Sequence, residues 1–349
     1  MRAAVMERGA FRVETLDDPV PGPGEVIAKS VACGICGSDL HAARHTEDFV
    51  ATSREAGGAF KLTTFDPVVL GHEFCAEVVD FGPGETPAGV RVGDHVCSVP
   101  MLARQPVVPV GYSPDAPGGF AEYMLLTAEL LQRVPTGLPP THAALTEPMA
   151  VGYHAVNMAR LEGGETTLVI GAGPVGLAVV AALKALRADA NAKAPGAILV
   201  AEYSPERRRL AEKLGADTVV DPAERAPWQL PEIAKGEPIV AFECVGVPGV
   251  IDQMFLGAPR HSRLVIVGVC LQTDHARPLI AINKELNVQY VLGYTAAEFA
   301  ETLRLIADGV LPVEPIITHT VGLDGVGEAF ETLATPNQQG KVLVAPWNA

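Results

Sequence analysis

The chain has 349 residues, of which 48% are hydrophobic and 19% charged, a balance that supports a large buried core and excludes a wholly disordered protein. Its 26 lysines and arginines are outnumbered by 41 aspartates and glutamates, and the resulting net charge of −15 argues against binding to the phosphate backbone of nucleic acids. Six cysteines are too few for a disulfide scaffold in so long a chain, and suit metal binding or burial.

The start of the chain, residues 1–16, carries several charges and no apolar segment of the kind that a secretory signal needs. The longest uncharged apolar stretch, residues 168–183, is shorter than the ~20 residues that cross a bilayer, and three glycines and a proline interrupt it. We therefore expect a cytoplasmic protein with no membrane segment and no nucleic-acid partner.

Residues 1 to about 150 consist of short segments separated by turn-forming sequences, such as PVPGPG at 19–24 and PDAPGG at 114–119. Between the turns lie runs of β-favouring residues, at 68–70, 76–81 and 90–99. This half of the chain is predicted to be rich in β-structure.

From about residue 166 the pattern changes to apolar strands that alternate with helices, which predicts a parallel sheet covered on both faces. The expected strands lie at 167–170, 197–201, 239–242, 264–267 and 287–292, and the expected helices at 174–187 and 205–214. The tail is expected to contain helices at 296–308 and 323–335 and a last strand at 341–344, and to rejoin the first half of the chain.

The run LVIGAGPVG places three glycines after an apolar strand and at the start of an amphipathic helix. Gly171 permits a tight turn, Gly173 lets the backbone approach a pyrophosphate, and Gly176 lets the helix pack closely on the strand. This context favours a dinucleotide site over a glycine-rich turn without a ligand. The residues predicted to contact the cofactor are Gly171, Gly173, Pro174, Val175 and Gly176.

Glu202 ends the next predicted strand, where an acidic residue can accept hydrogen bonds from a ribose 2′-hydroxyl. It lies farther along the chain than the usual spacing of about 20 residues, and we assign the excess to a loop at 189–196. A carboxylate would repel the 2′-phosphate of NADP, so NAD is favoured as the cofactor. Arg207 could instead pair with such a phosphate or with the adenosine ribose.

The first half also contains the residue types of a catalytic metal site. Cys36 stands in CGICGSDLH, and His72 and Glu73 stand in GHEF. A thiolate, an imidazole and a carboxylate can bind zinc and leave a position open for water or substrate. The alternatives are a redox-active pair of Cys33 with Cys36, and a purely structural His72.

Zinc would lower the pKa of a bound alcohol, and the released proton would then need a route out of the site. Ser38 carries a hydroxyl that both donates and accepts a hydrogen bond, and His41 titrates near neutral pH. These two residues are therefore candidates for a proton relay.

The chain resembles the medium-chain, zinc-dependent alcohol and polyol dehydrogenases over nearly its whole length. The segments that carry the likeness are GICGSDLH (34–41), GHEF (71–74), RVGDHV (91–96), GGFAEY (118–123), EPMAVGYHAV (147–156), GAGPVG (171–176), ECVG (243–246) and GKVLV (340–344). The resemblance implies an α/β protein with a β-rich GroES-like catalytic domain, residues 1–151 and 296–349. Residues 152–295 would form a doubly wound parallel-sheet (Rossmann) domain that binds NAD.

The resemblance also implies roles for single residues. Cys36 and His72 would bind zinc, Glu73 would be a ligand that exchanges with water, and Asp39 would orient His72. Glu147 stands where the sorbitol- and threonine-dehydrogenase-like branch has Glu and the liver-type enzymes have Cys, so it would bind zinc or hold the zinc-bound water.

For proton transfer and cofactor binding, Ser38 and His41 match the family's proton relay. The residues implied to line the nicotinamide pocket are Val245, Val267, Val269 and Gly293. The family's members associate as homodimers or homotetramers, which is the expectation for this chain.

The sequence departs from the family in its remaining cysteines. Many members carry a second, structural zinc bound by four closely spaced cysteines, and residues 98–112 contain none. We therefore expect one catalytic zinc and no structural zinc. The cysteines expected to be small buried apolar residues are Cys75, Cys97, Cys244 and Cys270.

A second departure is the length of the segment between the two metal-binding motifs, residues 42–70. It could be a lid that shapes the substrate pocket or a tolerated surface insertion, and both remain open. As a lid, it would bring Arg44 and His45 to the substrate.

These features favour a zinc- and NAD-dependent dehydrogenase that interconverts a small secondary alcohol, polyol or amino alcohol, or a primary alcohol, with its ketone or aldehyde. The alternatives are a zinc-free quinone or enoyl reductase of the same fold and a non-catalytic NAD-binding protein. Cys36 and His72 argue against the first alternative, and the intact relay argues against the second.

Overall fold

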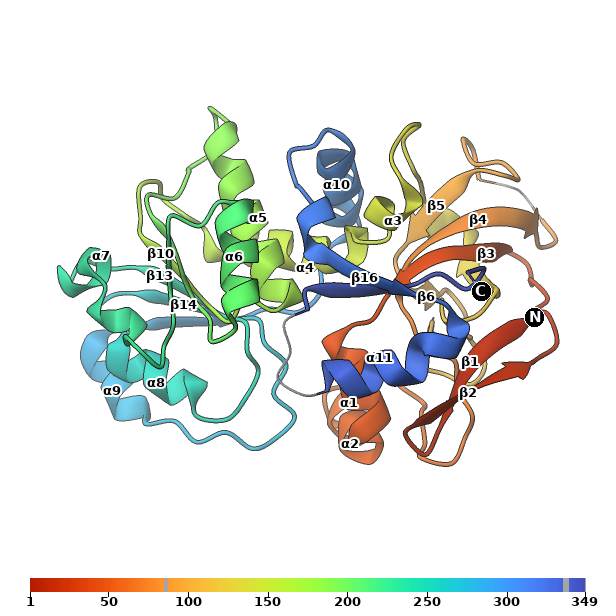
Figure 1. Ribbon diagram of the computed structural model, residues 1–349, viewed down its shortest axis with the longest axis horizontal. Coiled ribbons are helices and arrows are strands. Elements are labelled where there is room, and N and C mark those ends of the chain that lie inside the picture. Colours follow the sequence, from red (N-terminus) through yellow and green to blue (C-terminus); the bar gives the residue numbers. More distant parts are fainter. Residues whose placement is uncertain (85–86, 335–338, 349) are drawn as a thin grey trace.

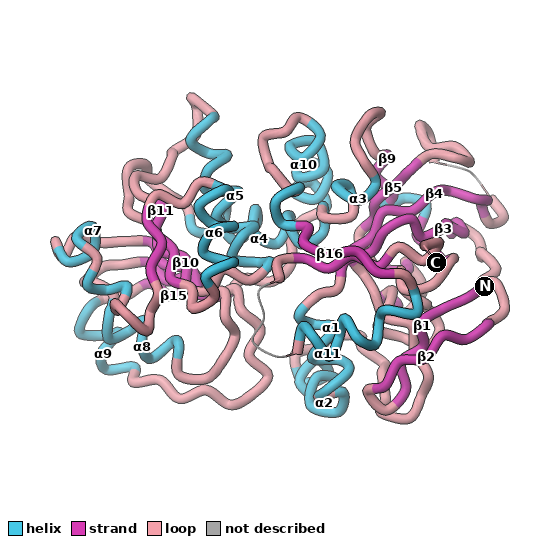
Figure 2. Tube along the Cα trace, in the orientation of Figure 1, coloured by secondary structure: helices cyan, strands magenta, loops and turns pink. Residues whose placement is uncertain are grey.

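The structure is a computed structural model that describes residues 1–84, 87–334 and 339–348. Figure 1 shows an elongated molecule, with both ends of the chain and the first part of the sequence on one side and the middle of the sequence on the other. Figure 2 shows that the strands gather in both of these parts, with helices around them. None of the helices in the described part of the chain is long and apolar enough to cross a membrane.

One sheet is a six-stranded parallel sheet in the order β12-β11-β10-β13-β14-β15. Its strands are β10 (Thr167–Ile170), β11 (Ile198–Ala201), β12 (Thr218–Val220), β13 (Val240–Glu243), β14 (Arg263–Ile266) and β15 (Asn287–Tyr290). The predicted parallel sheet is confirmed, although β12 was missed. From β10 the chain adds strands first on one side, as β11 and β12, and then on the other, as β13 to β15. Open parallel sheets bind ligands at the carboxyl ends of the two strands where the order switches, here β10 and β13.

Helices cover both faces of this sheet, because neighbouring strand residues point to opposite sides. Val169 packs with α4, α5 and α6, whereas Leu168 packs with α7, α8 and α9. Gly152 allows α4 and α5 to lie close together, since a Cβ there would come 2.5 Å from the carbonyl carbon of Ala178. The helices are α4 (Thr146–Ala159), α5 (Pro174–Ala188), α6 (Pro205–Leu214), α7 (Pro231–Ala234), α8 (Val250–Gly257) and α9 (Pro278–Lys284), with the short 3-10 helix η2 (Pro227–Gln229).

The other large sheet has seven strands in the order β16-β17-β3-β4-β5-β9, with β8 also paired to β3. Its strands are β3 (Glu25–Gly34), β4 (Glu73–Phe81), β5 (His95–Ser98), β8 (Tyr123–Thr127), β9 (Leu131–Arg133), β16 (Ile317–Val321) and β17 (Lys341–Val344). The tail of the chain therefore completes a sheet that its first half begins. Two small hairpins accompany it, β1 (Arg2–Glu7) with β2 (Ala10–Thr15), and β6 (Met101–Leu102) with β7 (Val108–Pro109).

The prediction of strands at 68–70 and 90–99 was wrong in part. Residues 68–70 make only one isolated bridge, from Val68 to Met6, and in 90–99 only β5 is a strand. The cause is a turn: Gly93 adopts a left-handed φ of +86°, and the Asp94 carboxylate accepts a hydrogen bond from the Arg91 N–H at 2.9 Å.

The remaining helices are α1 (Gly37–Arg44), α2 (Thr46–Glu55), α3 (Pro140–Ala143), α10 (Ala296–Ala307) and α11 (Val326–Leu333), with η1 (Ala128–Leu130), η3 (Glu314–Ile316) and η4 (Leu323–Gly325). The helix predicted at 323–335 is thus a 3-10 turn followed by α11, and its expected last residue, Thr335, lies outside the described residues.

Glu298 joins α10 to α4. Its carboxylate accepts hydrogen bonds from the backbone and hydroxyl of Thr295 and from the Asn157 amide, and it lies 2.8 Å from Nδ1 of His154. Burial by itself would raise the pKa of Glu298, but the hydrogen bonds from Asn157, Thr295 and His154 lower it to about 2. The charged carboxylate therefore stabilises the contact between these helices.

We expect Glu298→Gln to lower the free energy of unfolding at pH 7 by about 1–2 kcal/mol, after allowance for solvent screening. Because the folded pKa is depressed, this contribution is present above the ordinary pKa of 4.5 and is lost as the pH falls from 4.5 towards 2. Urea unfolding at pH 7 and at pH 3 measures both effects. Glu301→Gln is the matched control, because it removes only an exposed pairing with Arg304. If Glu298→Gln lost as much unfolding free energy at pH 3 as at pH 7, the stabilisation could not come from the charged carboxylate.

Candidate active site

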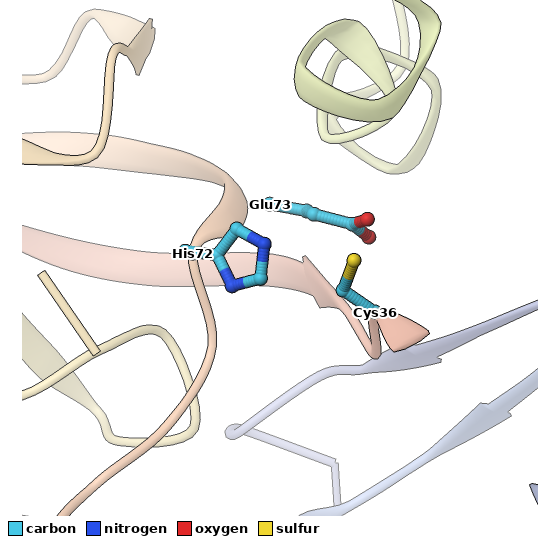
Figure 3. A group of neighbouring side chains, drawn as sticks. All are labelled: Cys36, His72 and Glu73. Atoms are coloured by element: carbon cyan, nitrogen blue, oxygen red, sulfur yellow. The ribbon is translucent and has the colours of Figure 1, made fainter. Parts of the chain in front are cut away.

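Cys36, His72 and Glu73 come together where β3 and β4 lie side by side, and their donor atoms all lie within 4.8 Å of one another (Figure 3). The antiparallel register pairs Gly34 with Glu73, which brings the turn after β3 to the start of β4. Gly34 also makes room for the carboxylate, since a Cβ there would lie 2.1 Å from Oε2 of Glu73. The chain therefore folds two separate motifs, each predicted to bind metal, into one cluster.

Asp39 connects two members of this cluster. Its Oδ2 accepts a hydrogen bond from the Cys36 N–H at 2.9 Å, and its Oδ1 lies 3.2 Å from Nδ1 of His72. Burial lowers the pKa of His72, but the charge and hydrogen bond of Asp39, together with Cys36, outweigh burial and raise it well above its ordinary value. With Nδ1 engaged by Asp39, Nε2 is the nitrogen that can bind a metal.

Lys341, on β17, is a residue of this site that the sequence analysis missed. Its Nζ donates to both carboxylate oxygens of Glu73 at 2.7 Å and to the carbonyl of Ile35 at 3.2 Å. The side chains of Lys341 and Glu73 are each only 1% exposed. Burial lowers the pKa of Lys341, but the charges of Glu73 and Cys36 outweigh burial and raise it above its ordinary value, so the ammonium group keeps its charge. A lysine within the apolar strand GKVLV was the one available signal.

Glu147 lies in the first turn of α4, beside the cluster but outside the group of three donors found among the described residues. The Tyr294 hydroxyl donates to its Oε1 at 3.0 Å, a partner that no sequence pattern predicted. Burial raises the pKa of Glu147 to about 7, partly opposed by His72 and reinforced by the charge of Glu73. This carboxyl group can therefore gain or lose a proton near neutral pH.

Ser38 and His41 are three residues apart on α1 and thus share one face of that helix. The hydroxyl oxygen of Tyr112 lies 2.8 Å from Oγ of Ser38 and 3.0 Å from Oδ1 of Asp39. Burial and, to a smaller extent, His45 lower the pKa of His41. Burial and the charges of Asp39 and Cys36 raise the pKa of Tyr112, so the phenol keeps its proton.

The glycine-rich turn between β10 and α5 has the shape that a pyrophosphate requires. Gly171 adopts a φ of +88°, and a Cβ on Gly176 would lie 1.9 Å from the Gly171 carbonyl oxygen. A Cβ on Gly173 would meet nothing within 4 Å, so there is open space in front of the N-terminus of α5. Pro174 and Val175 form the first turn of that helix. These residues fit a dinucleotide phosphate.

Glu202 follows β11 and lies against this turn. Its Oε2 accepts from the Ala172 N–H at 2.7 Å and its Oε1 from the Ser204 N–H at 2.8 Å. The side chain of Arg207 donates from Nε to the Gln339 carbonyl at 3.0 Å, and Nη1 of Arg208 pairs with Asp221 at 2.9 Å. The extra chain length before Glu202 is a loop between α5 and β11, as predicted.

The residues expected around the nicotinamide follow the carboxyl ends of β13, β14 and β15. Val245 and Val269 are 44% and 50% exposed, which leaves apolar surface available to a ring. Val267 is buried, and Gly293 adopts a left-handed φ of +59°. Glu243, which the sequence analysis also missed, accepts hydrogen bonds from the backbone of Val245 and Gly246 and thereby holds this loop.

The expectation of buried cysteines is confirmed for Cys75 and Cys97 and is wrong for Cys244 and Cys270. The latter two are partly exposed because each lies in a loop beyond the end of a sheet strand, β13 or β14, rather than in the core. Cys33 is fully buried in β3.

The long segment 42–70 contains the end of α1 and all of α2, and then an irregular stretch that leads to Gly71. It buries Phe49, Val50 and Leu62 in the same core as β3 and β4. Of the two residues proposed to reach substrate, Arg44 donates to the Ala334 carbonyl at 3.2 Å and His45 is exposed where α1 meets α2.

Comparison with known proteins agrees with this architecture. The model of the alcohol dehydrogenase GroES-like domain matches residues 22–136, and that of the zinc-binding dehydrogenases matches residues 174–308. The chain is 34% identical to (R,R)-butanediol dehydrogenase of Bacillus subtilis, with 96% of each chain covered. It is 34% identical to L-threonine 3-dehydrogenase of Pyrococcus furiosus, over 97% of this chain and 95% of that one.

Sorbitol dehydrogenase of Bos taurus is 29% identical over 93% of this chain and 90% of its own. The crystal structure of 2R,3R-butanediol dehydrogenase from Bacillus subtilis superposes with a TM-score of 0.83 at 33% identity, covering 99% of both chains. Similarity of this extent covers both large sheets of the molecule.

Proposed function

Since the chain belongs to the medium-chain, zinc-binding alcohol dehydrogenase family, we propose that its own cluster of Cys36, His72 and Glu73 forms the catalytic centre of an NAD-dependent alcohol oxidation that runs in both directions. The observation that carries the proposal is the convergence of a thiol, an imidazole and a carboxylate within 4.8 Å. Asp39 fixes the ring of His72, as a metal-binding imidazole requires. These donors suit zinc.

Zinc in this cluster would lower the pKa of the substrate hydroxyl, and the carbon-bound hydrogen would leave as hydride to the nicotinamide. Ser38, on α1 beside the cluster, is proposed to take the hydroxyl proton, and His41, one helical turn away, to pass it towards solvent. Glu147, held by Tyr294, is proposed to hold the water that fills the site between substrates. Lys341 holds Glu73 and balances its charge.

The substrate is proposed to be a small secondary alcohol with a second hydroxyl or an amine on the adjacent carbon. This chemistry is shared by butanediol, threonine and sorbitol, the compounds named for the three relatives. The direct test combines zinc content per chain, measured by plasma mass spectrometry on protein purified without chelators, with reduction of NAD by those three compounds. We expect one zinc per chain and turnover of at least one compound. If the protein contains no zinc and reconstitution does not restore it, a zinc-free reductase or a non-catalytic NAD-binding protein would be favoured instead.

Glu202 is proposed to set the preference for NAD. Its carboxylate lies against the glycine-rich turn, where a 2′-phosphate would meet a negative charge. We expect Glu202→Ala to reduce the ratio of kcat/KM for NAD over NADP by about tenfold, mostly through KM for NAD, since a lost charge-assisted hydrogen bond costs about 1.5 kcal/mol. Steady-state kinetics with both cofactors measures this ratio. Arg207→Ala is the control, and a ratio that changes there but not in Glu202→Ala would assign the preference to the arginine.

We also propose that the enzyme is a homodimer or homotetramer in the cytoplasm. The parallel sheet ends in the edge strand β15, whose outer backbone groups pair with no strand in the described part of the chain. Apolar residues near this edge are exposed, among them Leu279, Ile282, Tyr290 and Leu292. A second copy pairing along β15 would cover them. Free thiols at all six cysteines suit a reducing compartment.

A further inference from the structure

We infer that Tyr112 is a positioning residue whose single hydroxyl fixes Ser38, in the proposed proton path, and Asp39, which orients His72. This inference rests on the function proposed above. No sequence motif marks Tyr112, which lies in the irregular chain between β7 and β8. Its contacts join Ser38 and Asp39, which lie side by side on α1, to a segment that is more than 70 residues away in the sequence.

The hydroxyl of Tyr112 contacts two residues of the site at once. A phenol carries one proton, which can be shared between two neighbouring oxygen atoms. The Tyr112 hydroxyl is the donor in both contacts, at 2.8 Å from Oγ of Ser38 and 3.0 Å from Oδ1 of Asp39. Ser38 accepts from the phenol, so its own proton remains free to move to the next group of the proposed path.

Asp39 is anchored from several sides as a result. Its Oδ1 interacts with both Tyr112 and His72, and its Oδ2 with the N–H of Cys36. Asp39 is fully buried, so these protein groups, rather than solvent, satisfy its carboxylate. Loss of the Tyr112 hydroxyl would leave the His72 ring less firmly held.

Aromatic side chains pack around the ring of Tyr112. Its centroid lies 4.7 Å from that of Phe60, 5.7 Å from that of Phe49 and 5.0 Å from that of His72. Phe49 and Phe60 stack on each other at 4.9 Å, and Tyr112 is only 5% exposed. The N–H of Lys61 donates to the Tyr112 carbonyl at 3.2 Å. The long segment 42–70 therefore supports Tyr112, a role that was not considered from the sequence.

Gly111 brings the residue close to His72. It adopts a φ of +81°, and a Cβ there would come 3.1 Å from the carbonyl oxygen of Gly71. The positive φ and this close approach both favour glycine where the chain passes the start of β4. Tyr112 follows directly, over the His72 ring.

The test is Tyr112→Phe, which keeps the ring and removes the hydroxyl. Mutation of a residue that orients a metal ligand typically lowers metal affinity or activity about 10–100-fold. We expect kcat to fall about 10–100-fold with KM changed less than about threefold, and zinc to be lost about tenfold more readily to a chromogenic chelator. Tyr123→Phe is the matched control, because the Tyr123 hydroxyl makes no hydrogen bond to any residue that the structure describes and its ring packs on Trp347.

A double-mutant cycle with Ser38→Ala separates the effect of Tyr112 on Ser38 from its effect on Asp39. If Tyr112 acts on turnover through Ser38, adding Tyr112→Phe to Ser38→Ala lowers kcat by much less than tenfold, while zinc is still lost more readily. Fully multiplicative losses in kcat would overturn the link to Ser38. Tyr112→Phe that behaves like Tyr123→Phe in both kcat and zinc competition would overturn the inference as a whole. Zinc competition needs no substrate, so it tests the link to Asp39 even if the wild-type protein oxidises none of the alcohols and the proposed function fails.

Discussion

Cys36→Ser is expected to lose its zinc and at least about 10³-fold in kcat/KM, while NADH still binds. A serine hydroxyl stays protonated at neutral pH and is a poor zinc ligand, so the cluster keeps only His72 and Glu73 as donors. Charge stabilisation by a catalytic metal is worth several kcal/mol, and about 4 kcal/mol corresponds to 10³-fold in rate. The glycine-rich turn at Gly171 belongs to the other sheet, so cofactor binding is independent of this change.

Zinc content by plasma mass spectrometry, steady-state kinetics and a fluorescence titration with NADH measure the three quantities. Cys33→Ala is the matched control, because Cys33 is fully buried three residues earlier and does not belong to the cluster. A Cys33→Ala protein that loses activity as completely as Cys36→Ser would revive the redox-pair interpretation. Undiminished activity in Cys36→Ser would remove the cluster from the mechanism.

Lys341→Met is expected to lower the free energy of unfolding of the metal-free protein by about 3–5 kcal/mol. The substitution leaves the buried carboxylate of Glu73 without its cation, and an uncompensated buried charge is strongly destabilising. Replacing both partners by uncharged groups removes that cost, so Lys341→Met with Glu73→Gln should recover most of the loss. The zinc-loaded protein should be affected less, because the metal ion itself offsets the charge of Glu73.

Urea unfolding of the metal-free and zinc-loaded forms, followed by fluorescence, gives the midpoints for the wild type, the single variant and the double variant. Equal midpoints for Lys341→Met and the double variant would mean that the loss comes from packing of the lysine stem rather than from the unpaired charge. A larger loss with zinc than without it would contradict the electrostatic explanation.

The position of Lys341 shows why part of the site lay beyond sequence reasoning. Cys36, His72 and Glu73 could be predicted because each stands in a short motif whose residue types suit a metal. Lys341 reaches Glu73 only because β17 pairs with β3, which pairs with β4, across 268 residues of chain. A lone lysine in an apolar strand has no periodic pattern that indicates its partner.

Tyr112 and Tyr294 were missed for the same reason. Each donates a single hydroxyl to a residue far away in the sequence, Tyr112 to Asp39 and Tyr294 to Glu147. The segment 42–70 is a related case, since its length was visible but its aromatic contacts with Tyr112 were not. Such contacts depend on how loops cross, which local propensity does not determine.

By itself, the sequence determined the parallel sheet, the glycine-rich turn and which residues form the cluster of Cys36, His72 and Glu73, because these depend on local periodicity, on glycine geometry and on residue chemistry within short motifs. It misjudged the strand at 90–99, where the turn at Gly93 overrides the β-favouring run. Tertiary structure alone decided the Glu73–Lys341 pair, the place of Glu147 beside the cluster and the link through Tyr112. Those features arise from strand register and chain crossings between segments that are distant in sequence, so only the folded chain brings their atoms within hydrogen-bond distance.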